Sequence, residues 1–598
     1  MSKKNYFIST NLEFNIDKKN KQILAGGWCI NNHKKDNLQK HDVLENFWRN
    51  KKKYNSYYKY LQKLSLIYSK RLSFYLNSFH KKKLSVNFWK IILMPWLTIY
   101  LPVYYYRWLA VKKILKRKDT INFYDLYNLK KNNIYADTFD FHTKTASNKY
   151  INYNIFYSLM KHHQVKNNRI IFHKKKLLNY DKKINLKENK LFYYLFSFYN
   201  KILNRILYFF YHRNKIFIEK AVFPIRNNIE MNLKLNQIPT YPNDTFNNSF
   251  GYTGLYKYNK INLVKRRSFN LGKKVKTDTF IKYIDSVIRD DIPKCFVEGF
   301  DNLCNFSEKI KFKPKIILSS YYHYFNELFK VWTAHLVERK KTKLFIVSHG
   351  GGSYLKNPSC LNFETEVADI KINWHRSKKK KEIQLPASKF FNFRKTKSLK
   401  KNSICYVEGP VSPYPSRIGD QIIDNGSPML NSEFLKFFKK IYKPLKKQFI
   451  FIPSSNYGVD TTINLKNDLK LRQIKENKSF KKYKHTSRLN ILNYPQTAFF
   501  ESLMIAPTIL LYKKNDWVFD KEFLNFYKKF VKHKIIFHDP IKAAKHVNFI
   551  SNDINGWWNS KVIQSIIKDF LDHTCVVSNF SLEIWSNSLK TQFSKVND

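Results

Sequence analysis

Short apolar runs, each followed by a longer amphipathic stretch, recur along the second half of the chain from about residue 276 onward. Runs of this kind, rich in Ile, Leu, Val and Phe, are typical of buried strands in a parallel sheet covered by helices. A helix is expected at 322–339, between the first two runs. The expected strands are 316–318, 344–347, 404–407, 449–452, 490–492, 508–511 and 535–537.

The first half of the chain has a different pattern. A strand at 22–25 is followed by Gly26-Gly27-Trp28-Cys29, which predicts a tight turn. From about 43 to 220, charged and aromatic residues alternate at three- and four-residue spacing, which predicts a mainly helical insertion.

The predicted fold class is therefore α/β, with two Rossmann-like parallel-sheet domains and a large helical insertion in the N-terminal half. Residues 1–385 form the N-terminal domain, 386–401 a linker and 402–555 the C-terminal domain, and 556–598 a helical segment. Ligands of such sheets bind beyond the carboxyl ends of the strands, so the loops that follow the strands are where a site is expected.

Two apolar segments raise the question of a membrane contact. Residues 91–106 carry sixteen uncharged side chains, but the segment is short for a span and contains Pro95 and Pro102, so we expect a buried helix–turn–helix. Residues 192–210 are interrupted by Lys201 and Arg205, which predicts an amphipathic helix. For both segments, contact with a membrane surface is the alternative interpretation.

The chain is strongly basic, with 109 Lys+Arg against 44 Asp+Glu and a net charge of +65. The lysines are spread among Asn, Ile, Tyr and Phe along the whole chain, which indicates a coding bias and a solvated basic surface. An anionic membrane is the second interpretation of this charge and nucleic acid the third. Because the sequence has neither zinc-finger spacing nor a long basic tail, we expect no nucleic-acid partner.

Cysteine usage and the N-terminus bear on the compartment. The six cysteines are far apart and never form a C-x-x-C pair, which is typical of a reduced protein. The first residues lack the apolar region of a signal peptide. We therefore expect a cytoplasmic protein.

Glycine is scarce, at 14 of 598 residues, yet Gly350, Gly351 and Gly352 are consecutive and follow an expected strand. Glycines at such a strand end let the backbone approach an anion, and successive N–H groups form a nest for phosphate oxygens. His349 can donate to that phosphate or act as a general acid or base, and Ser353 extends the loop. The alternative is a ligand-free turn with a core histidine. The oxyanion hole of lipases is excluded, because it requires a G-x-S-x-G motif that the sequence lacks.

A second candidate segment is 493–502, which follows a strand and opens a helix. Thr497 and Glu501 are four residues apart, so they share a helix face near the N-terminus, with Ser502 beside them. The helix N-terminus suits a phosphate, and a carboxylate one turn later can accept hydrogen bonds from a ribose diol. The alternative is a helix cap with an exposed glutamate.

Motifs that the sequence lacks narrow the chemistry. It contains no D-x-D pair, no H-E-x-x-H, no G-x-x-x-x-G-K-[ST] and no G-x-G-x-x-G. A bound metal, a P-loop ATPase and a simple dehydrogenase are thus disfavoured, and we expect no cofactor. Two α/β domains with phosphate-suited loops and no metal motif are the outline of the metal-independent glycosyltransferases called GT-B.

Several stretches, from the first ten residues to beyond residue 555, match the motifs of one known family. Residues 7–10 (FIST) and 26–29 (GGWC) resemble its L-A-T-T and L-G-E-W-C, with Gly27 in place of glutamate. Residues 88–97 resemble W-R-x-I-L-G-P-W-L, and 348–352 resemble Q-H-G-G-G with Ser348 in place of glutamine. The remaining matches are 494–503, 537–539 and 557–559. The chain thus resembles the LIC12162-type transferase family, which is associated with surface-carbohydrate biosynthesis.

The resemblance implies a GT-B-like glycosyltransferase and adds two site residues. Glu364, Asp369 and Trp374 fall where the family has E-x-x-x-x-D followed by a tryptophan. The two carboxylates are candidates for a general base or for sugar recognition; the alternative is that they pair with lysines. The predicted catalytic residues are His349, Glu364 and Asp369. The predicted donor- or phosphate-binding residues are Gly26, Gly27, Gly350, Gly351, Gly352, Ser353, Thr497, Glu501 and Ser502.

The function expected from the sequence is metal-independent transfer of a sugar from a UDP-, GDP- or CMP-linked donor to a surface polysaccharide or lipid-linked glycan. The protein would be cytoplasmic, with a peripheral contact to the inner face of the cytoplasmic membrane. Two alternatives stay open: a non-catalytic glycan-assembly or sugar-binding protein of the same fold, and a basic nucleic-acid-binding protein.

Overall fold

The structure is a computed structural model, and its described residues cover most of the chain. These are 5–14, 21–30, 41–165, 167–177, 214–239, 246, 254–272, 278–355, 360–391, 403–419, 432–453, 465, 480–514 and 516–597. The predicted amphipathic helix at 192–210 and most of the predicted linker, from 392 to 401, lie outside them.

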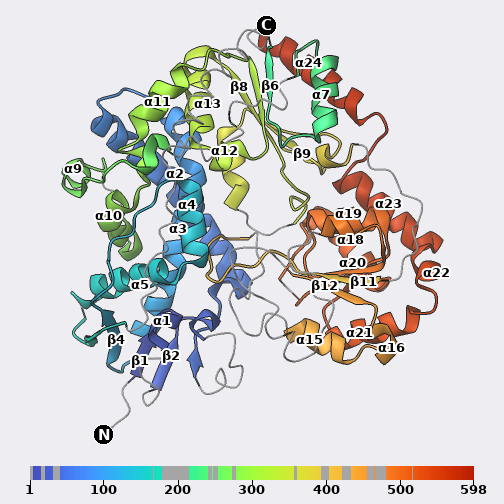
Figure 1. Ribbon diagram of the computed structural model, residues 1–598, viewed down its shortest axis with the longest axis horizontal. Helices are drawn as coiled ribbons and strands as arrows, with labels where there is room; N and C mark the ends of the chain where they lie inside the picture. Colours follow the sequence, from blue (N-terminus) through green and yellow to red (C-terminus); the bar gives the residue numbers. More distant parts are fainter. Residues whose placement is uncertain are drawn as a thin grey trace.

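The described strands form three five-stranded sheets in which every paired strand is parallel (Figure 1). The first sheet, in the order β3-β2-β1-β4-β5, holds β1 Asn5–Ile8, β2 Lys21–Leu24, β3 Asp42–Val43, β4 Ile121–Leu126 and β5 Ile170–Lys175. The second, in the order β10-β9-β8-β7-β6, holds β6 Ile216–Ile218, β7 Ile316–Ser319, β8 Lys343–Val347, β9 Ile370–Asn373 and β10 Glu382–Gln384. The third, in the order β12-β11-β13-β14-β15, holds β11 Ser403–Val407, β12 Phe449–Ile452, β13 Ser487–Leu492, β14 Thr508–Leu511 and β15 Ile536–Phe537.

The α/β class predicted from the sequence is confirmed, and the chain carries one more parallel sheet than the two expected. The added sheet arises because β4 and β5 lie inside the 43–220 segment that was predicted to be mainly helical. These strands pair with β1 and complete the first sheet. All seven strands expected in the second half are present; β13 begins three residues before its predicted start, and the other bounds agree within one residue.

The helices up to residue 367 pack around the first and second sheets and between them. They are α1 Asn11–Phe14, α2 Lys51–His80, α3 Val86–Leu115, α4 Thr138–Ser147, α5 Lys149–Gln164, α7 Ile225–Lys234, α9 Leu263–Ser268, α10 Thr279–Asp291, α11 Phe300–Glu308, α12 Tyr322–Phe325, α13 Glu327–Lys340 and α14 Glu364–Val367. The helix expected at 322–339 is divided into α12 and α13, because the side chain of Asn326 accepts a hydrogen bond from the N–H of Phe329 and caps α13.

Helix α3 corrects the prediction of a helix–turn–helix at 91–106. It runs unbroken from Val86 to Leu115 with Pro95 and Pro102 inside it. Ser85 caps its N-terminus by accepting a hydrogen bond from Phe88 N–H. By length and composition α3 is apolar enough to cross a membrane, but 78% of its most apolar window is buried inside the protein. It packs between α2, α4, α5 and α13 as a core helix.

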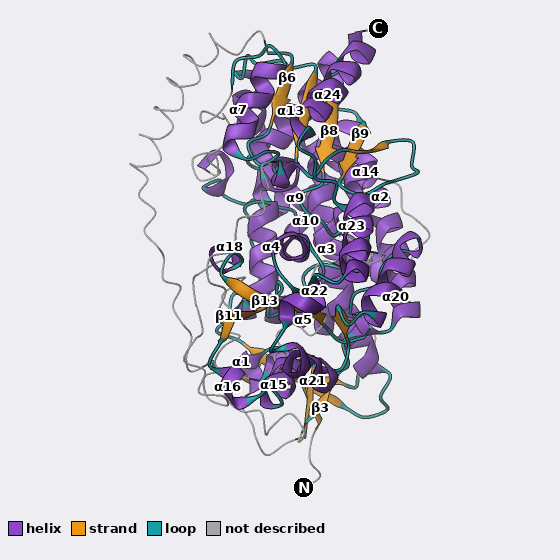
Figure 2. Cartoon of the chain, turned by 90° about the vertical axis from the view of Figure 1, so that its right-hand side faces the viewer, coloured by secondary structure: helices purple, strands orange, loops and turns teal. Residues whose placement is uncertain are grey.

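The helices of the second half cover the third sheet and then return to the second. They are α15 Ser432–Lys439, α16 Lys443–Lys446, α18 Phe480–Tyr483, α19 Thr497–Ile505, α20 Leu524–Lys532, α21 Pro540–Ile550, α22 Ile554–Trp558, α23 Lys561–Thr574 and α24 Ser581–Asn597. Figures 1 and 2 show α24 lying beside α7, next to the second sheet and away from the third. Trp585 of α24 is fully buried in the core of the second sheet, where its Nε1–H donates to Pro386 O over 2.8 Å. The helical character predicted for 556–598 is present.

Candidate functional site

A polar cavity of about 440 Å³ lies where the second sheet meets the third. Its walls are the loops that follow β8 and β9, residues around α14, the N-terminus of α19 and the loop that follows β11. The charged or ionisable side chains lining it are His349, Glu364, Lys371, His375, Lys379, Glu382 and Arg417. Gly350, Gly351, Gly352, Ser353, Gln496 and Thr497 complete the part of the wall predicted from the sequence. The two candidate segments are therefore brought together in one site.

The glycine loop packs directly against α19. A Cβ on Gly350 would lie 2.5 Å from Thr497 Oγ1, and one on Gly351 would lie 2.3 Å from the Phe500 ring. Both distances are shorter than side-chain contacts allow, so each position requires glycine. The N–H of Gly351 donates to Thr497 Oγ1 over 3.3 Å, which leaves the Thr497 proton to be donated elsewhere.

Gly352 differs from its two neighbours. A Cβ there would meet the Gln496 side chain at 3.6 Å, an ordinary van der Waals contact. The close approach of α19 therefore explains Gly350 and Gly351 and not Gly352. This residue and Ser353 border the cavity with Gln496 and Thr497 opposite.

A chain of hydrogen bonds fixes the floor of the cavity at the carboxyl ends of β8 and β9. Ser348 Oγ donates to Asn373 Oδ1 over 2.9 Å, and Asn373 Nδ2 donates to Glu382 Oε2 over 2.7 Å. Lys379 Nζ lies 3.1 Å from Glu382 Oε1. Burial would raise the pKa of that carboxyl, but hydrogen bonds from Ser377 and Lys379 outweigh burial and lower the pKa. The serine that stands in place of a glutamine in the family motif thus has a defined partner.

His349 lines the cavity at the end of β8, and its ring packs against that of Tyr321 in a tilted arrangement, with ring centroids 5.7 Å apart. Although the residue is partly exposed, loss of water around the imidazole, together with the positive charge of Lys389, lowers the pKa of His349 to about 4. The imidazole is consequently neutral at pH 7, with one nitrogen to donate and one to accept a proton. An anion bound beside it would favour the protonated form and raise this pKa.

Glu364 is fully buried and doubly paired. His323 Nε2 lies 3.2 Å from its Oε1, and Lys371 Nζ lies 3.0 Å from its Oε2. Burial alone would raise the pKa of Glu364, but Lys371 and His323 outweigh it and lower the pKa to about 2. A carboxylate held so firmly in its charged form is a weak proton acceptor, so the geometry favours the pairing alternative over a general base.

The pairing continues behind the cavity to Glu219, which directly follows β6. His323 Nδ1 lies 3.0 Å from Ser319 Oγ, and Ser319 Oγ donates to Glu219 Oε2 over 2.5 Å. The same Glu219 oxygen accepts from the N–H of Ser320 over 2.8 Å. These contacts tie the ends of β6 and β7 to α12 and hold His323 against Glu364.

Asp369 lies at the other edge of the second sheet. It precedes β9, and its Oδ2 accepts the N–H of Leu344 at the start of β8 over 2.9 Å. Its Oδ1 lies 3.4 Å from Lys343 Nζ. Because parallel strands share their polarity, this is the amino edge of the sheet, opposite the cavity. The structure therefore gives Asp369 the lysine-pairing role that was its alternative, and it drops out of the catalytic set.

The described lining of the cavity does not include Ser502 or Glu501, although they share a helix with Thr497. Ser502 is fully buried, accepts from Asn490 Nδ2 over 2.8 Å and contacts Thr508 Oγ1 at 2.6 Å. Its position in the helical turn directs it at the third sheet, so its role is structural. Glu501 is one turn behind Thr497, with its Oε2 3.7 Å from Lys484 Nζ.

Gly26 and Gly27 lie at the carboxyl edge of the first sheet, and the described lining of the cavity does not include them. A Cβ on Gly26 would lie 2.2 Å from the ring of Trp28, and that ring donates from Nε1 to Ser9 O over 3.0 Å. Trp28 also packs against Tyr414 from the loop after β11, with centroids 5.8 Å apart. Gly26 therefore leaves room for the Trp28 ring. The turn at 26–27 was predicted to face the same site as 350–352, but it is not part of the described lining of the cavity.

Arg417 is the main site residue that sequence reasoning missed. It lines the cavity from the loop that follows β11. Two neighbours anchor this loop on the first half of the chain: Tyr414 N–H donates to Ala146 O over 3.0 Å, and Pro415 O accepts from the guanidinium of Arg107. Arg417 could have been suggested from the sequence by its position after a predicted strand, where ligand-binding loops are expected.

His375, Lys371 and Lys379 were also missed, because β9 and β10 were not predicted. Residues 370–373 read Ile-Lys-Ile-Asn, a period-two alternation that indicates a strand. His375 follows that strand and has its Nδ1 2.8 Å from Ser353 Oγ. Burial lowers the pKa of His375 to about 4, so it too is neutral at pH 7.

The fold and site together define an α/β protein of parallel sheets whose inter-sheet cavity is lined by cations, neutral histidines and a helix N-terminus. The LIC12162 family transferase profile matches residues 5–589. The chain belongs to this family of transferases, as its sequence motifs indicated.

Comparisons with other proteins add less. No curated protein matches the chain. Two solved structures are similar to part of it: the spinosyn rhamnosyltransferase SpnG complexed with spinosyn aglycone, and SpnG alone. Both are 11% identical; the first covers 46% of this chain and 75% of that one with a TM-score of 0.25, and the second 48% and 77% with a TM-score of 0.29.

Proposed function

We propose that this transferase moves a sugar from a nucleotide-sugar donor to a surface polysaccharide or lipid-linked glycan, without a metal, in the cavity between the second and third sheets. The observation that carries the proposal is the meeting of the 350–353 loop and the N-terminus of α19 across one cavity. Both elements are suited to phosphate oxygens, and they come from different sheets.

The charges around the cavity support an anionic donor. Arg417 faces the glycine loop, and its guanidinium can bind a phosphate through two hydrogen bonds. Thr497 has a hydroxyl proton to donate on the same wall. Lys371 and Lys379 add positive charge, although each is paired with a glutamate. A UDP-, GDP- or CMP-linked sugar carries the matching negative charge.

His349 takes the role of proton carrier in this proposal. Neutral before the donor binds, it gains a proton as the phosphates raise its pKa. The imidazolium then donates to the leaving phosphate as negative charge develops on it, and stabilisation of that charge is the main catalytic contribution. Glu364 acts through His323 and Lys371 as a positioning residue, because its own charge is already compensated.

Nucleotide binding is the first test. UDP, GDP, CDP, CMP and UMP are each titrated into the full-length protein by calorimetry, and one of them is expected to bind with micromolar affinity. Arg417→Ala should weaken that nucleotide about tenfold or more, since a charge-assisted contact is lost. Arg169→Ala, which removes an exposed arginine from the turn before β5, is the control and should leave the affinity unchanged. Binding of none of the five nucleotides would contradict the proposal.

Transfer is the second test. The protein is incubated with the sugar-linked form of the bound nucleotide and a glycan acceptor, with and without EDTA, and product is followed by mass spectrometry. Transfer that persists in EDTA supports the proposal. Tight nucleotide binding with neither transfer nor donor hydrolysis would instead favour a non-catalytic sugar-binding protein.

The proposal includes a peripheral contact with the inner face of the cytoplasmic membrane. Two exposed aromatic side chains support it: Tyr442 between α15 and α16, and Phe549 at the end of α21, 67% and 85% exposed. Asn548 Oδ1 accepts the N–H of Tyr442 over 3.0 Å, which holds the two segments together. Exposed lysines at 439, 440, 443, 542 and 545 surround the pair. Aromatic residues among lysines suit the interface of an anionic bilayer.

A further inference from the structure

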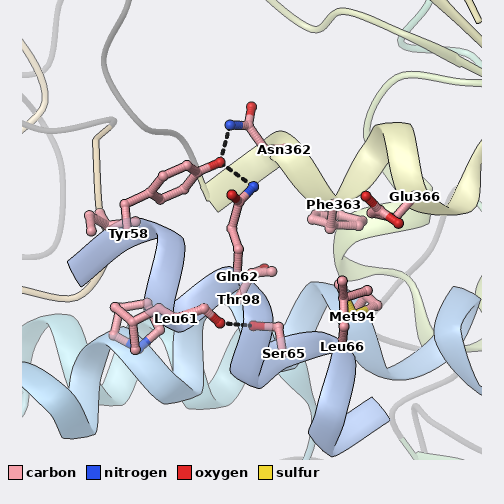
Figure 3. A pocket seen from close by; sticks show the side chains of 12 residues that line it. Tyr58, Leu61, Gln62, Ser65, Leu66, Met94, Thr98, Asn362, Phe363 and Glu366 are labelled. Atoms are coloured by element: carbon pink, nitrogen blue, oxygen red, sulfur yellow. Dashed lines mark hydrogen bonds between the residues drawn. The ribbon is translucent and has the colours of Figure 1, made fainter. Parts of the chain in front are cut away.

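A second, smaller pocket of about 110 Å³ lies beside the polar cavity, between α2, α3 and the short helices at 360–367 (Figure 3). We call it the slot. Half of its lining residues are apolar: Leu61, Leu66, Met94, Pro102, Phe363 and Ile418. Its polar lining residues are Tyr58, Gln62, Ser65, Thr98, Asn362 and Glu366.

Two of the three hydroxyl groups in the described lining of the slot, those of Ser65 and Thr98, are bonded back to the helices that carry them. Ser65 Oγ donates to Leu61 O over 2.9 Å, as Figure 3 shows, and Thr98 Oγ1 donates to Pro95 O over 3.2 Å. Their protons are thereby used within the helices, and the methylene of Ser65 and the methyl of Thr98 belong to the apolar wall. The slot is thus suited to an alkyl or ring surface, with few donors to offer a polar ligand.

The slot and the polar cavity share their dividing wall. Gln62 and Asn362 line both, and Figure 3 shows Tyr58 between them, with its hydroxyl bonded to each. At two places consecutive residues face opposite sides: Arg417 lines the cavity and Ile418 the slot, and Glu364 lines the cavity and Phe363 the slot. The two spaces are therefore adjacent, and an amphipathic molecule lying alongside these shared residues would place its polar end in the cavity and its apolar end in the slot.

Charge divides the two spaces in the same sense. The cavity lining has three cations, Arg417, Lys371 and Lys379, against the two carboxylates Glu364 and Glu382, whereas Glu366 is the charged residue in the described lining of the slot. The Glu366 carboxylate is exposed and would repel a phosphate placed in the slot. The anionic donor therefore belongs in the cavity, and a neutral apolar group belongs in the slot.

We propose that the slot binds the neutral apolar portion of the acceptor, so that the acceptor of this transferase is amphipathic: its hydroxyl lies in the polar cavity and its hydrocarbon lies against Leu66, Met94 and Phe363. This inference rests on the proposed function, because the bound molecule is an acceptor only if the protein transfers a sugar to it. The slot itself is tested without any sugar transfer.

The test uses photolabelling of the full chain. An octyl glycoside with a diazirine in its alkyl chain is irradiated with the protein below its critical micelle concentration, and the labelled residues are mapped by mass spectrometry. Label is expected on α2, α3 and 361–366 around the slot. Octyl glucoside should compete about tenfold or more better than methyl glucoside, because each buried methylene contributes about fourfold in affinity.

Two substitutions at one position give the matched comparison. Leu66→Trp fills the slot and should reduce slot labelling about tenfold, whereas Leu66→Met conserves volume and should keep it. Leu66 is only partly buried, and the melting temperature of each variant checks its folding. Glu366→Lys provides a second route, since it should raise the affinity for octyl sulfate about fivefold or more relative to octyl glucoside. Label elsewhere on the protein, or slot label that Leu66→Trp leaves intact, overturns the inference.

Failure of the inference and failure of the proposed function are distinguishable. Slot labelling in a protein that binds nucleotide and yet transfers no sugar overturns the transferase proposal and leaves the apolar site standing. Transfer that Leu66→Trp and Leu66→Met catalyse equally well, with octyl and methyl glycosides as equal acceptors, overturns the slot proposal and leaves the transferase standing.

Discussion

The lack of a Cβ at Gly351 allows the loop after β8 to approach α19 closely. A methyl group there would lie 2.3 Å from Phe500 and 3.2 Å from Trp374, whereas one on Gly352 would make only a 3.6 Å contact. We expect Gly351→Ala to lower the free energy of unfolding by about 1–3 kcal/mol through overpacking. Gly352→Ala, its control, should change stability by less than about 0.5 kcal/mol. Denaturant unfolding measures both, and equal effects would show that the contact with α19 does not set the loop.

Glu364 stabilises the fold through its charge. Its pKa of about 2 lies below the ordinary value of 4.5, so its stabilisation is fully present above pH 4.5 and is lost as the pH falls toward 2. Glu364→Gln leaves His323 and Lys371 facing a neutral amide and should cost about 3 kcal/mol at pH 7. Glu366→Gln, two residues away and exposed, is expected to cost less than about 0.5 kcal/mol. A destabilisation by Glu364→Gln that stayed constant from pH 7 to pH 3 would refute the charge argument.

In the proposed function, we expect His349 to couple nucleotide binding to proton uptake. Its pKa of about 4 in the free protein rises when phosphate binds, so at pH 6 the wild type should take up a fraction of a proton that His349→Gln does not. Because the proton is gained on binding, the affinity advantage of the wild type over His349→Gln shrinks as the pH rises from 5 to 8. Calorimetry in two buffers of different ionisation enthalpy measures the uptake. Identical proton counts for both proteins would remove His349 from the phosphate site.

Among the helices, α24 has a structural role beyond its own length. Trp585 is fully buried in the second sheet's core and donates to Pro386 O, while its neighbour Ile584 is 40% exposed. Trp585→Ala should lower the free energy of unfolding by about 3–5 kcal/mol, and Ile584→Ala by less than about 1 kcal/mol. Hydrogen exchange should show the loss in β6 to β9 first. If faster exchange in Trp585→Ala were confined to α24, the helix would not contribute to the stability of the second sheet.

Among the elements, individual strands could be predicted from the sequence more reliably than the number of sheets into which they assemble. Strands β11 to β15 were predicted because each is a short apolar run buried on both faces. Strands β4 and β5 were missed because their mixture of aromatic and polar residues is similar to that of the surrounding helices. The site followed the same rule. His349 and Thr497 could be found from local pattern, but their contact depends on how two sheets pack.

The errors in the predicted site concern the sheet edge or the helix face on which a residue lies, which cannot be read from its position in the sequence alone. Asp369 is near the glycine loop in sequence, but it precedes a strand instead of following one, so it lies at the opposite edge. Ser502 is one residue from Glu501, and that one step of the helix turns it to the third sheet. Arg417 lies in a loop without a motif, and its placement depends on Arg107 more than 300 residues earlier.

For the molecule as a whole, the proposed membrane contact predicts where binding is lost. Replacing Tyr442 and Phe549 by serine should weaken binding to phosphatidylserine vesicles about tenfold, because two interfacial aromatic groups are removed. Replacing Val165 and Val264 by serine is the control, since these side chains are 85% and 81% exposed. Sedimentation with vesicles measures both, at 0.1 M and at 0.5 M salt, where screening should weaken the wild type as well. Equal binding by the two double variants would place the contact elsewhere.

The return of α24 to the second sheet has a consequence for synthesis. The strands β6 to β10 leave the ribosome roughly 200 residues before Trp585 does, which at ordinary elongation rates is about 10 to 40 seconds. During that time Phe223 and Phe391, whose rings later lie 4.9 Å and 6.3 Å from the Trp585 ring, have no indole to cover them. The third sheet, which is made in between, can close its own core first. The order in which the two units mature is thus the reverse of the order in which their strands are translated.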